Sequence, residues 1–406
     1  MFDGDLMNWA KAWMCLRVGV LLLGAAFLIH HAWDQAGAIL GYQPLGIDFL
    51  PMWSAAREAF SHPARIYDFA GLTHFEHPLL GHFRGLRPFV YPPPALLLYL
   101  PFSLAPFTVA DPAWIMTGVF AIVGVMAMKL RAHPLLLLAG MLLTPASVLV
   151  VVTGQVTFLI AAMAIGGVFA LKDRPVLAGV LFGLAGAIKP QALVLAPIAL
   201  LALRQWRTLG AAALAAALAV LVSGLVFGVH AWEGWLAAVP RFQRMVMASP
   251  GLTRGMVTPT VLGAWLGLGP DALTMWRLAF GLGAVVICWG VFASTEDPAR
   301  RIAALLGGGL FITPYAMHYD AALLAPVAAL MLSTRTGFTS WVLSAAAAAA
   351  LCCAAIPHWG ALAVTGFVLW AALAPETMFA GRLAFADRGS GRAVAGGGLS
   401  PAGQDR

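Results

Sequence analysis

Apolar runs of about twenty residues recur along almost the whole chain, which is the length that a helix needs to cross a bilayer. Runs of this kind cover residues 13–32, 134–171, 175–203 and much of 208–293. Strands of a membrane barrel would alternate apolar and polar residues, and these runs do not. Because a helix satisfies its own backbone hydrogen bonds in lipid, the pattern predicts an all-α polytopic membrane protein.

The composition agrees, since 61% of the 406 residues are hydrophobic and 10% are charged, against about 25% charged in soluble domains. The net charge of +7 does not indicate a nucleic-acid partner, because Lys and Arg lie in short clusters between apolar runs. These clusters occupy residues 129–131, 172–174, 204–207 and 298–301, with Arg335 and Arg382 further on. Such clusters mark cytoplasmic loops, so the charge reports membrane topology and membrane lipids are the expected surroundings.

With the basic clusters inside, the stretches 134–171, 175–203, 208–293, 302–333 and 338–374 each predict an out-and-back pair of helices. Residues 13–32 predict a signal anchor with a cytoplasmic N-terminus. Proline-rich residues 91–112 and 258–269 predict re-entrant segments, with a full helix from about residue 113. The expected result is a single membrane domain over residues 1–385, with about twelve crossings of an inner (plasma) membrane. A disordered cytoplasmic tail is expected over 386–406.

This topology sends most unusual polar residues to one face of the membrane. The outer face receives the 33–90 loop, Gln155, Lys189, the 230–257 stretch and residues 318–320. The active surface is therefore expected at the outer (periplasmic or extracellular) interface of the membrane with water.

Three polar positions have both a structural and a functional interpretation. Lys189, beside Pro190, is either a lysine that snorkels to the interface or an anion-binding residue in a membrane-level pocket. Gln155 either caps a turn or donates to a phosphate or sugar hydroxyl. Asp320 either favours a helix N-terminus or belongs to a site with His318, which is titratable.

The 33–90 loop raises the same question for Asp48, which either begins a surface helix near Phe49 as its N-cap or takes part in chemistry. Segments 49–60 and 70–80 predict short amphipathic helices on the membrane surface. Four histidines of this loop lack a cysteine or close carboxylate pair, so we expect a headgroup-facing loop and no metal site. Its arginines, at positions 57, 65, 84 and 87, are expected to hold lipid phosphates or to pair with Asp68 or Glu76.

Several motifs in order resemble the polyprenol-phosphate-sugar-dependent glycosyltransferases of family 87. These motifs are "DFLPMWSAA" in the first outer loop, "YPPP", "GQ", and "GVLFGLAGAIKPQALVLAPIALL" followed by "RQWR". The similarity covers roughly residues 40 to 330. It implies the GT-C helical fold, with bacterial mannosyltransferases as the best-known members.

The resemblance implies that Asp48 is the catalytic residue, acting as general base on an acceptor hydroxyl. Gln155, Lys189 and His318 are the implied donor-phosphate residues, and Arg57 or Arg254 would assist them. The substrate-binding residues expected around them are Tyr91, Tyr319, Asp320 and Trp53. The implied reaction is an inverting transfer of a hexosyl group, expected to be mannosyl, to a glycolipid, polysaccharide or protein, without a cofactor.

A transporter or flippase of a lipid-linked or small polar substrate is the alternative from another class, because it also has many helices and intramembrane charge. Transport normally leaves polar residues in mid-membrane, and often inverted repeats. Here the polar residues collect on one face and no repeat is visible. The pattern favours the transferase.

Overall fold

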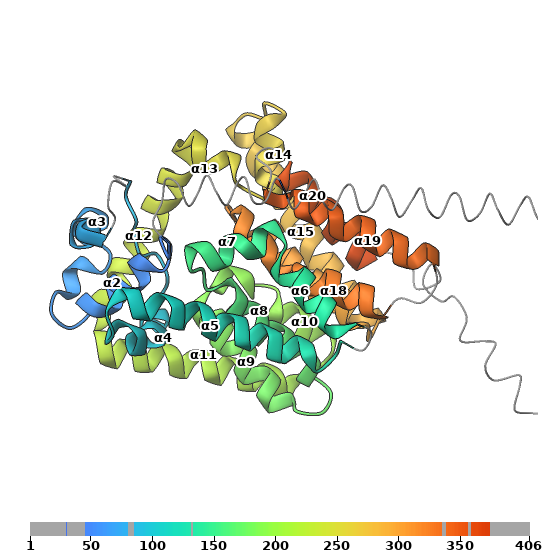
Figure 1. Ribbon diagram of the computed structural model, residues 1–406, viewed down its shortest axis with the longest axis horizontal. Helices are drawn as coiled ribbons and strands as arrows, with labels where there is room; N and C mark the ends of the chain where they lie inside the picture. Colours follow the sequence, from blue (N-terminus) through green and yellow to red (C-terminus); the bar gives the residue numbers. More distant parts are fainter. Residues whose placement is uncertain are drawn as a thin grey trace, which may run out of the picture.

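The computed structural model describes residues 30, 45–79, 85–130, 133–334, 338–355 and 359–373, and within these residues it is helical, with no β-strand (Figure 1). A lone antiparallel bridge joins Met256 to Met317. The first apolar run apart from residue 30, the basic residues Arg131, Arg335 and Arg382, and the C-terminal tail lie outside the described residues.

The elements follow one another along the chain with short connections. The α-helices are α2 (Leu50–Glu58), α3 (Phe69–Glu76), α4 (Pro93–Ser103), α5 (Phe107–Ala127), α6 (Pro134–Leu142), α7 (Pro145–Thr153), α8 (Thr157–Ala170), α9 (Pro175–Ile188), α10 (Ala196–Ala202), α11 (Trp206–Phe227), α12 (Val229–Ala248), α13 (Pro250–Arg254), α14 (Pro259–Trp265), α15 (Pro270–Ser294), α16 (Pro298–Ile302), α17 (Gly308–Ile312), α18 (Ala325–Thr334), α19 (Phe338–Cys352) and α20 (Gly360–Leu373). Shorter turns are η1 (Pro63–Arg65), η2 (His77–Leu79), η3 (Pro190–Ala192), η5 (His318–Leu323) and η6 (Cys353–Ala355), with a π-helical turn η4 (Ala303–Gly307).

Helices α5, α11 and α15 are each long and apolar enough to cross a membrane. The pair α6 and α7 passes the same test together but is bent by 65° at its break. Among the described residues there are thus three candidate spans, or four if the bent pair counts as one. Helices α8, α9 and α20 are apolar but shorter, as is the Pro190–Ala202 stretch. The all-helical prediction is confirmed, whereas about twelve crossings stay a prediction.

Several prolines begin a helix where the sequence predicted that they would break one, while Pro101 and Pro112 lie inside α4 and α5. Helix α4 starts at Pro93, and α14 and α15 start at Pro259 and Pro270. The first turn of a helix leaves its N–H groups unpaired, so a proline there loses no hydrogen bond. For the same reason the next helix starts at Phe107, behind Pro106, earlier than the expected position near residue 113.

Helix α2 is buried, which differs from the surface helix expected over residues 49–60. Eight of its nine residues are buried and Arg57 is the exposed one. The helix packs against α3, α4 and α5 (Figure 1). Apolar residues such as Leu50 and Met52 therefore contact protein on all sides. The expected helix over 70–80 corresponds to α3, which Asp68 caps by accepting from the Ala70 N–H at 3.2 Å.

Contacts between helices bring segments that are distant in the sequence close together. Helix α7 packs against η5, and α12 contacts η1 and α4. Helix α9 ends where η3 begins, which places a break in the apolar 175–203 stretch. The polar residues singled out by the sequence lie at these ends and breaks.

Candidate functional site

The turn that precedes α2 carries Asp48 and is tied to the end of α7. The Gly46 N–H donates to the Val152 carbonyl at 2.9 Å, and the Asp48 N–H donates to the Thr153 carbonyl at 2.9 Å. The Phe49 N–H also reaches the Thr153 carbonyl, at 3.1 Å. These bonds fix the backbone of Asp48 relative to α7.

Gly46 and Gly154 make this close approach possible. Both have positive φ, +69° and +73°, a conformation that glycine adopts without strain. Gly154 ends α7 as its left-handed cap, with its N–H donating to the Val150 carbonyl at 3.0 Å. A Cβ on Gly154 would lie 2.6 Å from the Phe49 Cβ. A side chain there would push the Asp48 turn away from α7.

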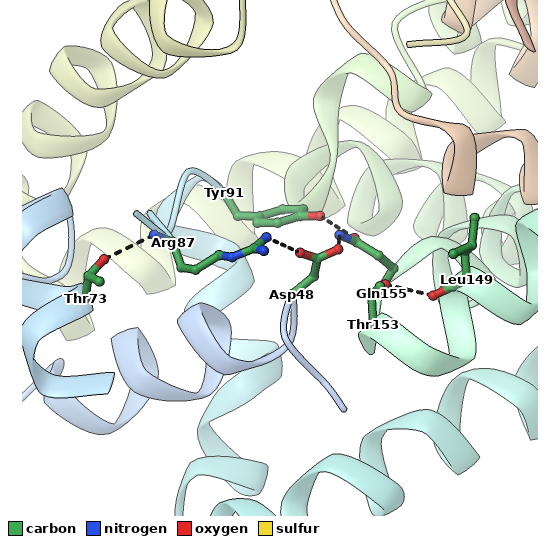
Figure 2. Close-up of polar contacts among 7 residues, drawn as sticks. All are labelled: Asp48, Thr73, Arg87, Tyr91, Leu149, Thr153 and Gln155. Atoms are coloured by element: carbon green, nitrogen blue, oxygen red, sulfur yellow. Dashed lines mark hydrogen bonds and ion pairs between the residues drawn. The ribbon is translucent and has the colours of Figure 1, made fainter. Parts of the chain in front are cut away.

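The Asp48 carboxylate lies between two donors from different parts of the chain (Figure 2). Arg87 Nη1 contacts Oδ1 at 3.2 Å, and Gln155 Nε2 donates to Oδ2 at 2.9 Å. The side chain of Asp48 is 18% exposed and that of Arg87 20%. The N-cap of α2 is Phe49, and no side chain caps the helix. The interpretation of Asp48 as a helix cap is therefore wrong.

The amide of Gln155 is oriented by Tyr91. The Tyr91 hydroxyl donates to Gln155 Oε1 at 3.3 Å, so the amide nitrogen faces Asp48 (Figure 2). Gln155 is 8% exposed. Its side-chain amide donates to Asp48, and its backbone N–H donates to the Val150 carbonyl in the turn that follows α7. The turn interpretation holds for its main chain, while donation by its amide to a phosphate or sugar hydroxyl stays a prediction, because the amide nitrogen here donates to Asp48.

Residues 85–91, which we call the strap, carry both Arg87 and Tyr91. The strap contains no helix or strand, and three side chains form hydrogen bonds with its backbone. Thr73 Oγ1 accepts from the Arg87 N–H at 3.1 Å, and the Tyr67 hydroxyl donates to the Tyr91 carbonyl at 2.9 Å. The indole N–H of Trp235, on α12, donates to the Val90 carbonyl at 3.1 Å.

Lys189 and Asp320 form a second, buried pair. Lys189 follows α9 in non-helical geometry, and its Nζ lies 2.5 Å from Asp320 Oδ1. The two side chains are 7% and 8% exposed, and Asp320 Oδ2 accepts from the Met317 N–H at 3.0 Å. Each buried charge thus has a partner, which burial requires. The sequence places Lys189 and Asp320 131 residues apart.

His318 is close enough to both carboxylates, Asp48 and Asp320, to be influenced by their charges. Its backbone N–H and its Nδ1 both approach the Gly255 carbonyl, at 2.8 and 3.3 Å. Because a carbonyl can only accept, this contact favours a proton on Nδ1 and leaves Nε2 as acceptor. Burial lowers the pKa of His318, while the Gly255 carbonyl and the charges of Asp48 and Asp320 oppose that shift. Both carboxylates therefore act on this imidazole.

The remaining predicted residues divide into two kinds. The ring of Tyr319 lies beside that of His318, with ring centroids 5.8 Å apart, so Tyr319 belongs to the same site. Trp53 is buried and its indole donates to the Ala105 carbonyl at 3.0 Å, which favours a packing role. Arg57 donates to the Ser103 carbonyl at 2.7 Å and lies over the Trp53 ring. Arg254 is exposed at the end of α13. The structure does not bring Arg57 or Trp53 to Asp48.

Arg87 is the site residue that the sequence could not single out. It is one of several arginines in the first outer loop, and Asp48 was not among its expected partners. Arg65 instead pairs with Glu58 at 2.9 Å. The nearness of Arg87 to "YPPP" was a usable signal, because that motif carries Tyr91 of the same site.

An apolar groove of about 360 Å³ adjoins the site. Helices α9, α10, α11 and α12 contribute its walls. Pro190, next to Lys189, and Pro92, next to Tyr91, both line it. Trp232 and Trp235 contribute from α12. The wall of the groove therefore includes the chain neighbours of Lys189 and Tyr91.

Comparison with known families gives one match. A family profile described as "Glycosyltransferase family 87" matches residues 89–314, more than half of the chain. The matched region holds Tyr91, Gln155, Lys189, His230 and Arg254 and ends before His318. No significant match was found among curated proteins or among solved structures.

Proposed function

The chain belongs to glycosyltransferase family 87, and from this premise we propose that it transfers a hexosyl group from a polyprenyl-phosphate sugar to an acceptor hydroxyl at the outer face of the membrane. Membership of the family gives a membrane glycosyltransferase with a donor and an acceptor. The lipid-linked donor, the mannosyl group, the inverting course and the outer location belong to the proposal. An outward-facing enzyme needs a donor that the membrane carries, because nucleotide sugars are made in the cytoplasm.

The observation that carries the proposal is the way in which Asp48 is held. Arg87 and Gln155 each occupy one carboxylate oxygen, and each oxygen keeps a further lone pair for an acceptor hydroxyl. Donors on both oxygens hold the carboxylate in a single orientation. A carboxylate in this state is suited to act as a general base.

In the proposed step the acceptor oxygen attacks the anomeric carbon while its proton passes to Asp48. The bond from that carbon to the phosphate oxygen breaks, and the phosphate leaves with the electron pair. A single displacement inverts the anomeric carbon. The leaving phosphate gains negative charge, which fixed cations and hydrogen-bond donors stabilise.

Lys189 is the proposed phosphate-binding cation. Its ammonium group has three donors, and Asp320 takes one of them. Pro190, the next residue in the chain, lines the apolar groove. The isoprenoid chain of the donor would lie in this groove, with its phosphate near Lys189, because the groove is apolar and its lining includes Pro190, the chain neighbour of Lys189.

Asp48→Asn tests the assignment, with Asp68→Asn as the matched control in the same loop. We expect Asp48→Asn to insert normally and to lose about 10²- to 10⁴-fold of the transfer rate, the range for losing a general base. Asp68→Asn should transfer normally, because Asn also caps a helix. The assay uses purified protein in nanodiscs with a panel of polyprenyl-phosphate sugars and membrane lipid acceptors. Wild-type transfer from no donor in the panel contradicts the function, and substantial transfer by Asp48→Asn contradicts the role of Asp48.

A further inference from the structure

Trp235 connects the apolar groove to the polar site, and nothing in the proposed reaction assigns it a role. It lies on α12, lines the groove and donates its indole N–H to the Val90 carbonyl of the strap at 3.1 Å. The next residue of the strap, Tyr91, orients Gln155, and Gln155 holds Asp48. A continuous chain of contacts thus runs from the groove wall to the proposed catalytic carboxylate.

The strap holds Asp48 at both of its oxygens. Arg87 contacts Oδ1 directly, and Tyr91 acts on Oδ2 through Gln155 (Figure 2). A displacement of the strap would therefore change both donors of Asp48 together. A shift of about 1 Å in a catalytic group can reduce a rate about 10²-fold.

Two side chains hold the strap at successive carbonyls, Trp235 from α12 and Tyr67 from the turn before α3, against which α12 packs. Trp235 binds the Val90 carbonyl, and the Tyr67 hydroxyl binds the Tyr91 carbonyl at 2.9 Å. Gly234 packs so closely on Tyr67 that a Cβ there would lie 2.9 Å from its ring. The position of α12 therefore sets the position of the strap.

We propose that Trp235 is a positioning residue that couples occupancy of the groove by the donor's isoprenoid chain to the placement of Asp48. This inference rests on the proposed function, because the occupant of the groove is the lipid chain of the donor. A chain in the groove packs against the indole ring and keeps its N–H on the Val90 carbonyl. Without the chain, the indole is less tightly packed on its groove side, and the hydrogen bond to the Val90 carbonyl opens more often. The enzyme would thus transfer sugar faster from donors whose chain fills the groove.

Trp232 provides a matched control on the same helix. It also lines the groove, and its ring stands edge-on to Trp235 with centroids 5.6 Å apart. Among the described residues, however, the strap receives its indole hydrogen bond from Trp235 and not from Trp232. Phenylalanine at either position keeps an aromatic ring in the groove and removes one N–H.

The test compares kcat for mannosyl phosphate carried on a long polyprenyl chain and on a citronellyl chain. For wild type we expect a higher kcat with the long chain. Trp235→Phe should lower the ratio of the two kcat values about five- to tenfold, the effect of losing one hydrogen bond. Trp232→Phe should keep the wild-type ratio. Thermal unfolding of each variant in nanodiscs separates this effect from a loss of folding.

A second measurement does not need turnover. Hydrogen–deuterium exchange of the peptide covering residues 85–91 is followed with and without undecaprenyl phosphate. The lipid should slow exchange in wild type and in Trp232→Phe but not in Trp235→Phe. An unchanged kcat ratio in Trp235→Phe, an equal loss in both variants, or exchange that does not respond to the lipid overturns the coupling. If wild type transfers sugar from neither donor, the proposed function fails, and the exchange measurement still decides whether groove and strap are coupled.

Discussion

Lys189 has two roles to separate, because a buried ion pair with Asp320 is also a structural contact. Lys189→Ala would leave Asp320 buried without its partner, which costs about 3–5 kcal/mol. The double variant Lys189→Met with Asp320→Asn removes both charges, and Asn can still accept from the Met317 N–H. We expect the double variant to unfold at a temperature near that of wild type. Its KM for the donor should rise at least tenfold if Lys189 binds phosphate, as measured in the nanodisc assay.

If the double variant has the same KM for the donor as wild type, Lys189 does not bind the donor phosphate. That result would show that Lys189 serves only the fold. A single variant could not give this answer, because lost transfer and lost folding would look alike.

Glu76 on α3 gives a prediction for pH. Burial raises the pKa of Glu76 to about 8, although Ser54 and Arg87 oppose the shift. In the unfolded chain this carboxyl ionises near pH 4.5. Between pH 4.5 and 8 the folded protein holds a proton that the unfolded chain has released, so rising pH favours unfolding. Each pH unit in this window removes up to about 1.4 kcal/mol of stability.

Thermal unfolding in nanodiscs across that window should therefore show wild type losing stability relative to Glu76→Gln as pH rises. Glu233→Gln serves as the control, because Glu233 is exposed on α12. Parallel curves for wild type and Glu76→Gln would show that Glu76 is already ionised in the folded protein.

Much of the site could be predicted at the level of single residues. Asp48, Gln155, Lys189 and His318 stand out because polar groups are rare in so apolar a chain. Their pairings could not be predicted. Asp48 pairs with Arg87 and not with Arg57 because of the path that the strap takes in the fold. That path leaves no periodic signal in the sequence.

At the scale of elements, the end of α7 and the turn before α2 form one unit. Gly154→Ala would place a Cβ 2.6 Å from the Phe49 Cβ in a backbone conformation with φ of +73°. We expect a loss of about 1–3 kcal/mol in stability. Transfer should fall at least tenfold, because Gln155 and Asp48 would move apart. Gly124→Ala on α5 is the control, since its Cβ would meet nothing within 4 Å. Normal transfer by a folded Gly154→Ala protein would show that the site tolerates this separation.

Helix boundaries show why elements were harder to predict than residue types. A proline inside an apolar run is compatible with a broken helix or with the first turn of a new one. The sequence predicted a broken helix over residues 91–112, whereas in the structure helix α4 begins at Pro93. The burial of α2 was equally hidden, because packing against α3, α4 and α5 is a tertiary effect.

At the scale of the whole molecule, the long helix α11 links a basic turn to the groove and the site. Arg204 and Arg207 lie at its start, and its C-terminal end leads into α12, which carries Trp232 and Trp235. If α11 crosses the membrane, the basic turn and α12 lie on opposite faces. The positive-inside rule then puts α12, and with it the site, outside.

Cysteine labelling tests this arrangement directly. In a background without native cysteines, Arg207→Cys and Glu233→Cys each place one thiol at an exposed position. A membrane-impermeant maleimide should label Glu233→Cys in intact spheroplasts and Arg207→Cys only after permeabilisation. The opposite pattern would put the site in the cytoplasm, where nucleotide sugars are present. The enzyme would then have no need of a membrane-carried donor, although it would still belong to the glycosyltransferase family.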